Sequence, residues 1–427
     1  MVRERYSGTG SGQLHPSQDN KNAAGKILAE DVSRGTNQTG VRLYNERLIL
    51  SLIRRNVSLS KIDITHLTGL SAQTVSGIVN TLEKNGLLLR EAPQRGRVGQ
   101  PTVPFRINPD GAFSLGLKIG RRSSDFVLIN FMGKVLLRRK LTYKFPAPAD
   151  VLDFISKNLL EIEQHMTQEE MKHIAGLGIA APFELWNWET EVAAPREVLD
   201  RWRSFDVSAQ IAAICKWPVT SCNDATAACS AELIFGKGWQ HQSCIYFFIG
   251  SFIGGGIVLD GSLYQGRTGY AGAVGPLPIG VITDNGLQNQ QIIRHASTYV
   301  LENRLREQGI DSSPVWLTPD EWTGFGETLD LWMEETGKAL AHAIVSAVSF
   351  IDFDAAIIDG AIPDWVRKRI WENTTRHIKD FDLQGTAPFV VYEGTIGPQA
   401  RAIGAASLPY LENFARDRSV LFKHAES

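Results

Sequence analysis

The chain of 427 residues has few cysteines, no long unbroken apolar run and little net charge. Its four cysteines form no CxxC or CxC pair, which excludes a disulfide scaffold and disfavours a cysteine-rich zinc site. The longest uncharged apolar stretch, residues 244–259, contains four glycines, so it predicts strand, turn and strand instead of a membrane span of about 20 residues. The N-terminus MVRERYSGTGSGQ lacks the apolar segment of a secretory signal. We therefore expect a soluble, cytoplasmic protein with no membrane partner.

The charges that are present lie unevenly along the chain. Residues 41–107 contain ten Lys and Arg against four Asp and Glu, a net charge of +6. Residues 108–427 have a net charge of −9, and the whole chain has a net charge of −2. A basic segment joined to an acidic body indicates a nucleic-acid module attached to another domain, although a solvated basic surface gives the same count. At 43% hydrophobic and 21% charged residues, the chain has the composition of two or three globular domains.

The basic segment predicts a winged helix-turn-helix domain at residues 41–92. Residues 1–40 are rich in Gly, Ser, Asn, Gln and Thr without an apolar period, and we expect a disordered tail there. Helices are expected at 41–55, 61–68 and 72–85, the second beginning with a capping box of Ser60 and Asp63 and ending at Gly69. The third helix has one apolar stripe, formed by Val75, Ile78, Val79 and Leu82.

The opposite face of the third helix carries small polar side chains, which suit base edges in a major groove. Residues 87–90 and 103–107 predict the strands of a wing, with residues 93–107 as wing and linker and the motif RGRVGQP between the strands. Arginines flanked by glycines suit a minor groove or phosphates. The expected DNA-binding residues are Ser71, Gln73, Thr74, Ser76, Asn80, Lys84, Arg95, Arg97 and Gln100. An ordinary three-helix packing element and a flexible basic linker are the alternatives.

The body of the chain predicts layered α/β structure in two halves. Three apolar runs suit an antiparallel meander, and strands then alternate with helices. The expected strands are 113–119, 125–131, 134–144, 174–180, 245–249, 257–259 and 355–358, and the expected helices are 151–165, 222–235 and 331–351.

Several motifs together resemble the ROK family of repressors, open reading frames and sugar kinases, in its transcription-regulator branch. They are the helix-turn-helix, the GRVGQP linker, Asn223-Asp224-Ala225, IGSFIGGGIVLDGSLYQGRTGYAGAVG and GPQARAIGAASLP, within residues 41–413. The resemblance implies an α/β fold, in which a winged helix-turn-helix precedes a two-lobed, actin-like and ribonuclease-H-like sugar kinase (ATPase) fold. It places lobe 1 at 108–221 with a helix at 398–413, and lobe 2 at 222–397. It also implies a homodimer or homotetramer that leaves DNA when a sugar or sugar phosphate binds.

Departures from the family's kinase pattern argue against catalysis. ROK kinases carry Asp-x-Gly-Gly-Thr at the first strand, but here Lys118 replaces the carboxylate and Arg121 and Arg122 replace the Gly-Thr pair. Phosphoryl transfer needs a positioned metal and neutralised phosphates, so this charge reversal predicts no enzyme activity, no catalytic residue and no cofactor. Asp359 likewise lies where a Gly-Gly pair would pack against adenosine. Lys118, Arg121 and Arg122 could form a binding site for an anionic ligand, but we favour the interpretation that they are exposed charges at the end of a strand.

The zinc motif of the family is also absent. Ala273 and Pro276 replace the sugar-contacting Glu and zinc-binding His, and residues 277–297 contain no cysteine. Structural zinc needs about four nitrogen or sulfur ligands, so we expect no metal.

The residues expected to bind a ligand are Asn223, Asp224, Trp186 and Gly255. In the resembling kinases the Asn-Asp pair contacts the sugar, and a carboxylate remains a good acceptor for sugar hydroxyls. A helix-capping role for Asn223 and a core role for Trp186 are the alternatives. We thus expect a DNA-binding regulator with a double-stranded operator and a sugar-type effector as partners. The rival hypotheses are a sugar kinase with an added DNA-binding domain, and a ligand-independent DNA-binding protein with a vestigial cleft.

Overall fold

The structure is a computed structural model that describes residues 38–94, 101–183, 195–283, 286–416 and 421. Residues Arg47–Arg416 form one compact unit. Among the helices in these ranges, none combines the length and apolarity that crossing a bilayer requires.

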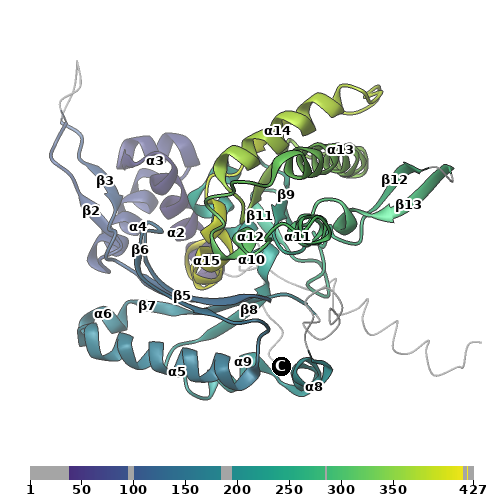
Figure 1. Cartoon of the computed structure of the whole chain (residues 1–427). Helices are drawn as coiled ribbons and strands as arrows, with labels where there is room; N and C mark the ends of the chain where they lie inside the picture. The colour runs from purple at the N-terminus through teal and green to yellow at the C-terminus, as the bar shows by residue number, and fades with distance from the viewer. Residues whose placement is uncertain (1–37, 95–100, 184–194, 284–285, 417–420, 422–427) are drawn as a thin grey trace, which may run out of the picture. The chain divides into compact units, whose positions relative to one another are not determined.

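A winged helix-turn-helix forms the first part of the described chain (Figure 1). The helices and both wing strands agree with the sequence prediction, but the first helix begins three residues inside the segment expected as a tail, and β1 was not predicted. In the sheet, β3 lies between β1 and β2 and is antiparallel to both. The elements are α2 (Gln38–Arg55), β1 (Ser58–Ser60), α3 (Lys61–Thr68), α4 (Ala72–Lys84), β2 (Leu88–Arg90) and β3 (Pro104–Ile107).

Local signals in the sequence explain these helices. The Ser60 side chain accepts from the backbone N–H of Asp63 while the Asp63 carboxylate accepts from the backbone N–H of Ser60, which confirms the predicted capping box. Gly69 ends α3 with a φ of 69°, a left-handed conformation that favours glycine. The apolar stripe of α4 is fully buried, and it belongs to a hydrophobic core shared with Phe131 and Tyr410 of the body.

Lobe 1 is a twisted sheet in the strand order β6-β5-β4-β7-β8, with the predicted meander at one side. Helices cover both faces, which is why every residue of β4 is buried. In Figure 1, α5, α6 and α9 lie below the sheet. The elements are β4 (Phe113–Ile119), β5 (Ser123–Asn130), β6 (Val135–Thr142), α5 (Pro148–His165), α6 (Gln168–Lys172), β7 (Ile174–Ala181), α8 (Arg196–Asp200), α9 (Val207–Ala212) and β8 (Val219–Asn223).

Lobe 2 has a second sheet in the order β11-β10-β9-β14-β15, in which β14 runs parallel to β9 and β15. A separate hairpin of β12 and β13 follows the first three strands. The elements are β9 (Cys244–Ile249), β10 (Gly254–Leu259), β11 (Ser262–Tyr264), β12 (Pro278–Thr283), β13 (Gly286–Gln291), α11 (Thr298–Glu307), α12 (Pro314–Leu317), α13 (Gly326–Phe350), β14 (Ala355–Gly360), α14 (Asp364–Ile378) and β15 (Val390–Glu393).

Helices α10 (Asp224–Phe235) and α15 (Ala400–Phe414) lie between the two sheets and pack against each other (Figure 1). Small residues allow this close approach. A Cβ on Gly178 of β7 would overlap the carbonyl oxygen of Ala405, and a Cβ on Gly404 would overlap that of Ala227. On β4, a Cβ on Gly116 would lie 2.5 Å from the nitrogen of Ala406. Helix α15 therefore has almost no freedom to move toward either neighbour.

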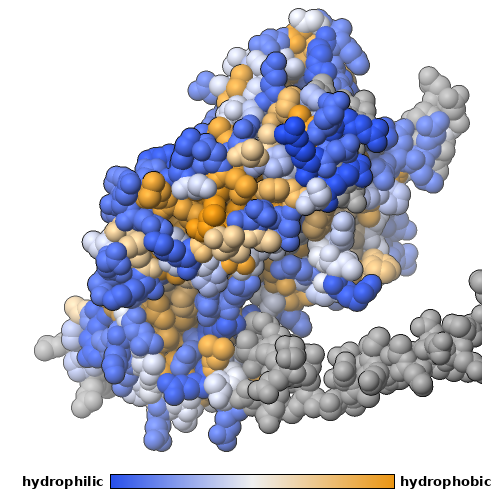
Figure 2. Space-filling model, turned by 90° about the horizontal axis from the view of Figure 1, so that it is seen from below, coloured by the Kyte–Doolittle hydropathy of each residue, from blue (hydrophilic) through white to orange (hydrophobic). Residues whose placement is uncertain are grey.

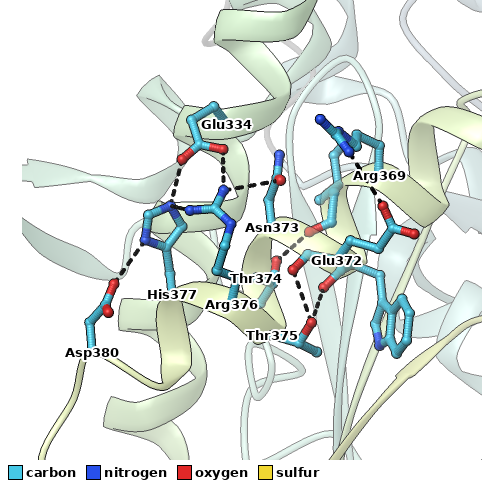
Figure 3. A network of polar contacts seen from close by, with 11 residues as sticks. Glu334, Arg369, Glu372, Asn373, Thr374, Thr375, Arg376, His377 and Asp380 are labelled. Atoms are coloured by element: carbon cyan, nitrogen blue, oxygen red, sulfur yellow. Dashed lines mark hydrogen bonds and ion pairs between the residues drawn. The ribbon is translucent and has the colours of Figure 1, made fainter.

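A polar network joins α13 to α14 on the far side of lobe 2 (Figure 3). Glu334 accepts from Nη2 of Arg376 at 2.5 Å and lies 2.8 Å from Nε2 of His377. The other ring nitrogen of His377 lies 3.3 Å from the Asp380 carboxylate. Although partial burial raises the pKa of Glu334, hydrogen bonds from His377 and Arg376 outweigh it and hold that pKa below its usual value.

The substitution Gly404→Ala should lower the stability of the fold, because the added methyl group overlaps the backbone of α10. We expect a loss of about 1–3 kcal/mol in the free energy of unfolding, measured by urea denaturation. Gly77→Ala is the matched control, since Gly77 also lies inside a helix but has nothing within 4 Å of a Cβ. That change should stabilise by about 0.5–1 kcal/mol. Equal effects at both glycines would contradict the packing of α15.

Candidate functional site

Helix α4 presents the polar face that the sequence predicted for DNA reading. The Ser71 hydroxyl caps the helix by accepting from the backbone N–H of Thr74 at 3.1 Å. Except for Ser76, which is half-buried, the predicted side chains on this helix and its cap are exposed: Ser71, Gln73, Thr74, Asn80 and Lys84. Arg95, Arg97 and Gln100 lie outside the described residues.

Lys61, the first residue of α3, belongs to the same surface and was missed in the sequence. Its Nζ donates to Oδ1 of Asn80 at 2.7 Å and to Oγ of Ser76 at 3.2 Å. These bonds orient two of the predicted base-reading side chains and add a positive charge beside them. The only signal in the sequence was a lysine at the start of the helix that precedes the turn. Its partners lie 15 and 19 residues further along the chain, so no local pattern indicated these hydrogen bonds.

Two arginines of α2 attach the DNA-binding domain to the body. Arg47 donates to the backbone carbonyls of Glu412 and Ala415, at the C-terminal end of α15, where the helix dipole favours a cation. Arg54 donates to the carbonyl of Phe131 and lies 4.6 Å from the centre of its ring. Burial lowers the pKa of Arg54 to about 10.

At the other end of α15, Arg401 pairs with the predicted ligand-binding carboxylate. Its Nη1 lies 3.0 Å from Oδ2 of Asp224, and their side chains are only 16% and 12% exposed. Asn223 caps α10 by accepting from the backbone N–H groups of Ala225 and Thr226, which confirms its capping interpretation. No local pattern predicts Arg401 at this place, because it lies 177 residues from Asp224 in the chain.

Gly255, another residue expected to bind a ligand, lies in close backbone packing. A Cβ on Gly255 would overlap the carbonyl oxygen of Tyr246 and lie 3.0 Å from that of Gly272, so glycine is needed there for packing. Phe183 and Tyr270 stack with ring centres 4.2 Å apart. Trp186 lies outside the described residues, and the ligand-binding roles of Gly255 and Trp186 stay predictions.

Lys118 is buried, so the expectation of an exposed strand-end charge is wrong at this residue. It lies directly opposite Asp125 in the antiparallel register of β4 and β5, with Nζ 3.2 Å from the carboxylate. Nζ also donates to the carbonyl and hydroxyl oxygens of Ser123, and Arg138 pairs with the other oxygen of Asp125. Burial, together with the nearby charge of Arg401, lowers the pKa of Lys118 to about 8, although the negative charge of Asp125 acts to raise it.

Arg121 and Arg122 are half-buried and extend from lobe 1 to lobe 2. The guanidinium of Arg121 lies 4.0 Å from the centre of the Phe252 ring. Arg122 lies 4.0 Å from the carboxylate of Glu302 and 5.4 Å from the Trp316 ring. These contacts hold the two lobes together at the turn where the kinases of the family carry a phosphate-binding loop.

The described residues do not fit the metals that the family resemblance implies. They contain no group of three or more His, Cys, Asp or Glu that could hold an ion. Where a magnesium-organising carboxylate belongs, the ammonium of Lys118 is ion-paired with Asp125. A cation there would be repelled instead of bound.

Asp359 has a structural environment at the place where the family pattern predicts adenosine. Its fully buried carboxylate accepts from the backbone N–H groups of Gly360 and Gly397 and from the hydroxyl of Tyr246, and Arg367 pairs with it at 3.4 Å. Burial, and then the charge of Glu232, raises the pKa of Asp359 to about 6. The carboxylate thus joins β14 and β9 to the segment that leads into α15.

The buried charge of Lys118 predicts a measurable pH dependence. The pKa of Lys118 is about 8 in the folded chain, whereas an ordinary lysine has a pKa of 10.5. Between pH 8 and pH 10.5 the unfolded chain therefore binds more protons at this residue than the folded chain does. As the pH rises from about 8 to about 10, the free energy of unfolding of the wild type should increase relative to that of Lys118→Met by about 1–2 kcal/mol. Exposed Lys134→Met serves as control for the loss of a lysine. A difference that does not vary with pH would contradict the buried site.

Comparison with known proteins agrees with this architecture. The ROK family pattern matches residues 114–410, and a winged helix-turn-helix DNA-binding pattern matches residues 42–88. The xylose repressor of Bacillus subtilis is 27% identical over 242 residues, 57% of this chain and 62% of that protein. That of Caldicellulosiruptor bescii is 27% identical over 240 residues, 56% and 59% of the two chains. The chain thus spans about three fifths of the length of these relatives.

Solved structures share the fold. A ROK family transcriptional regulator, a homologue of the E. coli MLC protein, superposes with a TM-score of 0.61 at 20% identity over 88% of this chain and 98% of that one. A ROK family glucokinase from Streptomyces griseus, in complex with glucose and AMPPNP, gives a TM-score of 0.54 at 19% identity over 70% and 99%. With its helix-turn-helix, its two lobes and a family match over most of its length, the chain belongs to the ROK family.

Proposed function

We propose that this protein is a sequence-specific DNA-binding transcriptional repressor whose ROK domain senses a sugar-type ligand in the cytoplasm. The observation that carries the proposal is the exposed polar face of α4 on a winged helix-turn-helix that shares a hydrophobic core with the ROK body. Helices of this kind read base edges in the major groove. The similarity to xylose repressors supports regulation by a sugar.

In this proposal, residues 41–92 read the operator, residues 93–107 form the wing and linker, and the two lobes hold the ligand. The protein does not act as a kinase. Lys118 is paired with Asp125 where a metal-organising carboxylate would be needed, and Asp224 is paired with Arg401, so it is not available as a general base.

Helix α15 supports a route from ligand to DNA. Arg401 in its first turn contacts Asp224, and the carbonyls at its last turn accept from Arg47 of the DNA-binding domain. Because α15 is tightly packed along its length, a shift at one end has to move the other end. A ligand that binds one position of this helix better than the other changes DNA affinity by its differential free energy, typically 1–3 kcal/mol.

The proposed repressor acts as a homodimer or homotetramer. Recognition helices of this class read two half-sites about 34 Å apart, which requires two copies. The face drawn in Figure 2 has a band of hydrophobic residues bordered by hydrophilic ones, a pattern typical of surfaces that another protein covers.

Selection of binding sites from random duplexes tests the DNA-binding function. The full chain should enrich a two-fold related sequence and bind it with an affinity that falls steeply with salt. Gln73→Ala should weaken binding and relax the preference at one position in each half-site, at a cost of about 1–3 kcal/mol. Gln164→Ala, at an exposed glutamine of α5, is the control. If the chain enriches no sequence at low salt, the proposed function is wrong.

The substitution Arg47→Met tests the route through α15. It removes the hydrogen bonds to the carbonyls of Glu412 and Ala415 but leaves the Asp224–Arg401 pair intact. A sugar-type ligand found by thermal shift should still raise the melting temperature of this variant, while its effect on operator affinity falls by about tenfold. Unchanged release from DNA would show that the signal travels elsewhere.

A further inference from the structure

Arg401 has more hydrogen-bond donors than partners in the described part of the chain. A guanidinium offers five N–H groups in a planar fork, and Arg401 donates one of them to Asp224. Its Nε is buried and has no partner there, while the plane lies 4.9 Å from the centre of the Phe248 ring. An arginine held in this way is pre-organised to bind a second oxyanion.

The charges around Arg401 leave an excess of positive charge. The described groups are the cations Lys118, Arg138 and Arg401 and the carboxylates Asp125 and Asp224, and Arg138 reaches the cluster from the partly exposed strand β6. Both helices that meet here add to this excess, because α10 begins at Asp224 and α15 begins one residue before Arg401. Helix N-termini favour negative charge, so a cation in the first turn of α15 is compensated only by Asp224.

On lobe 2, Arg401 is bordered by Gly250, which has no side chain, and by the Phe248 ring. Gly250 directly follows the end of β9, and a Cβ at Gly250 would lie 3.6 Å from Nη1 of Arg401 and 3.4 Å from the Phe248 ring. Asp224 directly follows the end of β8. Ligands of α/β folds bind at such carboxyl ends of strands.

We propose that the ligand of this site is an anionic sugar derivative, bearing a carboxylate or a phosphate that pairs with Arg401. The inference rests on the proposed sensing function and names the chemical class of the ligand. The anion takes the N–H groups of Arg401 that have no partner and competes with Asp224 for the rest. Asp224 is thereby released to accept hydrogen bonds from the hydroxyl groups of the same ligand.

This exchange explains why an anion is needed. A neutral sugar offers Arg401 only hydroxyl oxygens, which cannot replace the charge of Asp224 in a nearly buried pair. A carboxylate or phosphate replaces it with an equal or greater charge, so the site stays compensated when the pair opens. Opening the pair also frees the first turn of α15, at the end of the helix that is linked through its last turn to Arg47.

Thermal shift and calorimetry on the full chain test the proposal with matched ligands. The probes are xylose and xylonate, glucose with gluconate, glucuronate and glucose 6-phosphate, and inorganic phosphate alone. At least one acid or phosphate should bind about ten- to hundredfold more tightly than its neutral parent. Tight binding of carboxylates, or of the phosphate ester, identifies which source of negative charge the site takes. Equal or tighter binding of a neutral sugar, binding of no probe, or binding of inorganic phosphate as well as of any sugar derivative overturns the proposal.

Variants assign the binding to Arg401. Arg401→Gln should abolish the preference for the anion, and Arg401→Lys, which keeps the charge and the partner of Asp224, should retain part of it. Arg369→Gln removes an exposed arginine of α14 and is the control. An unchanged preference in folded Arg401→Lys and Arg401→Gln proteins overturns the assignment. If a neutral sugar releases the protein from its operator, this inference fails while the proposed function stands; if the chain binds no specific DNA, the function itself fails.

Discussion

The contact of α15 with β7 and α10 constrains the rest of the molecule. At two points, Gly178 against Ala405 and Gly404 against Ala227, the backbones are so close that one methyl group does not fit. Such contact places the two sheets on opposite sides of one helix pair and keeps α15 from bending toward either neighbour, so that the helix moves only as a rigid unit. It also determines what lies at each end of α15. The Asp224–Arg401 pair lies at the N-terminal end, and the carbonyl groups that accept hydrogen bonds from Arg47 lie at the C-terminal end.

Around this helix, the carboxylates of the central region are compensated within the protein. Asp125 is held by Lys118 and Arg138, Asp224 by Arg401, and Asp359 by backbone N–H groups, Tyr246 and Arg367. In a phosphoryl-transfer enzyme, carboxylates at such places face a metal and a nucleotide. Here the arrangement favours a fixed scaffold, with Arg121 and Arg122 holding the lobes together across the same region.

The local structure was predictable from the sequence because its signals are local. The capping box at Ser60, the glycine at Gly69 and the buried stripe of α4 depend on residues within one or two helical turns, and all agree with the structure. The fold class followed from motifs and is confirmed by the family matches. Strand β1 was missed because three residues without an apolar pattern form a strand only by pairing with β3.

The predictions of the site were less complete, since its charges pair over long distances in the chain. The burial of Lys118 was deducible, because an antiparallel turn at residues 120–122 places it opposite Asp125. The pairing of Arg401 with Asp224, and of Lys61 with Asn80, depends on how separate helices pack, which no local pattern indicates. Asn223 shows the reverse case: its capping role is local and agrees with the structure.

The cross-strand pair of Lys118 and Asp125 limits which single substitutions this part of the sheet tolerates. Restoring a carboxylate at position 118 alone would place it opposite Asp125 in a buried sheet, and like charges facing each other there are destabilising. A metal site at this place therefore requires coordinated replacements on two strands, because the first replacement alone leaves two facing carboxylates in a buried sheet.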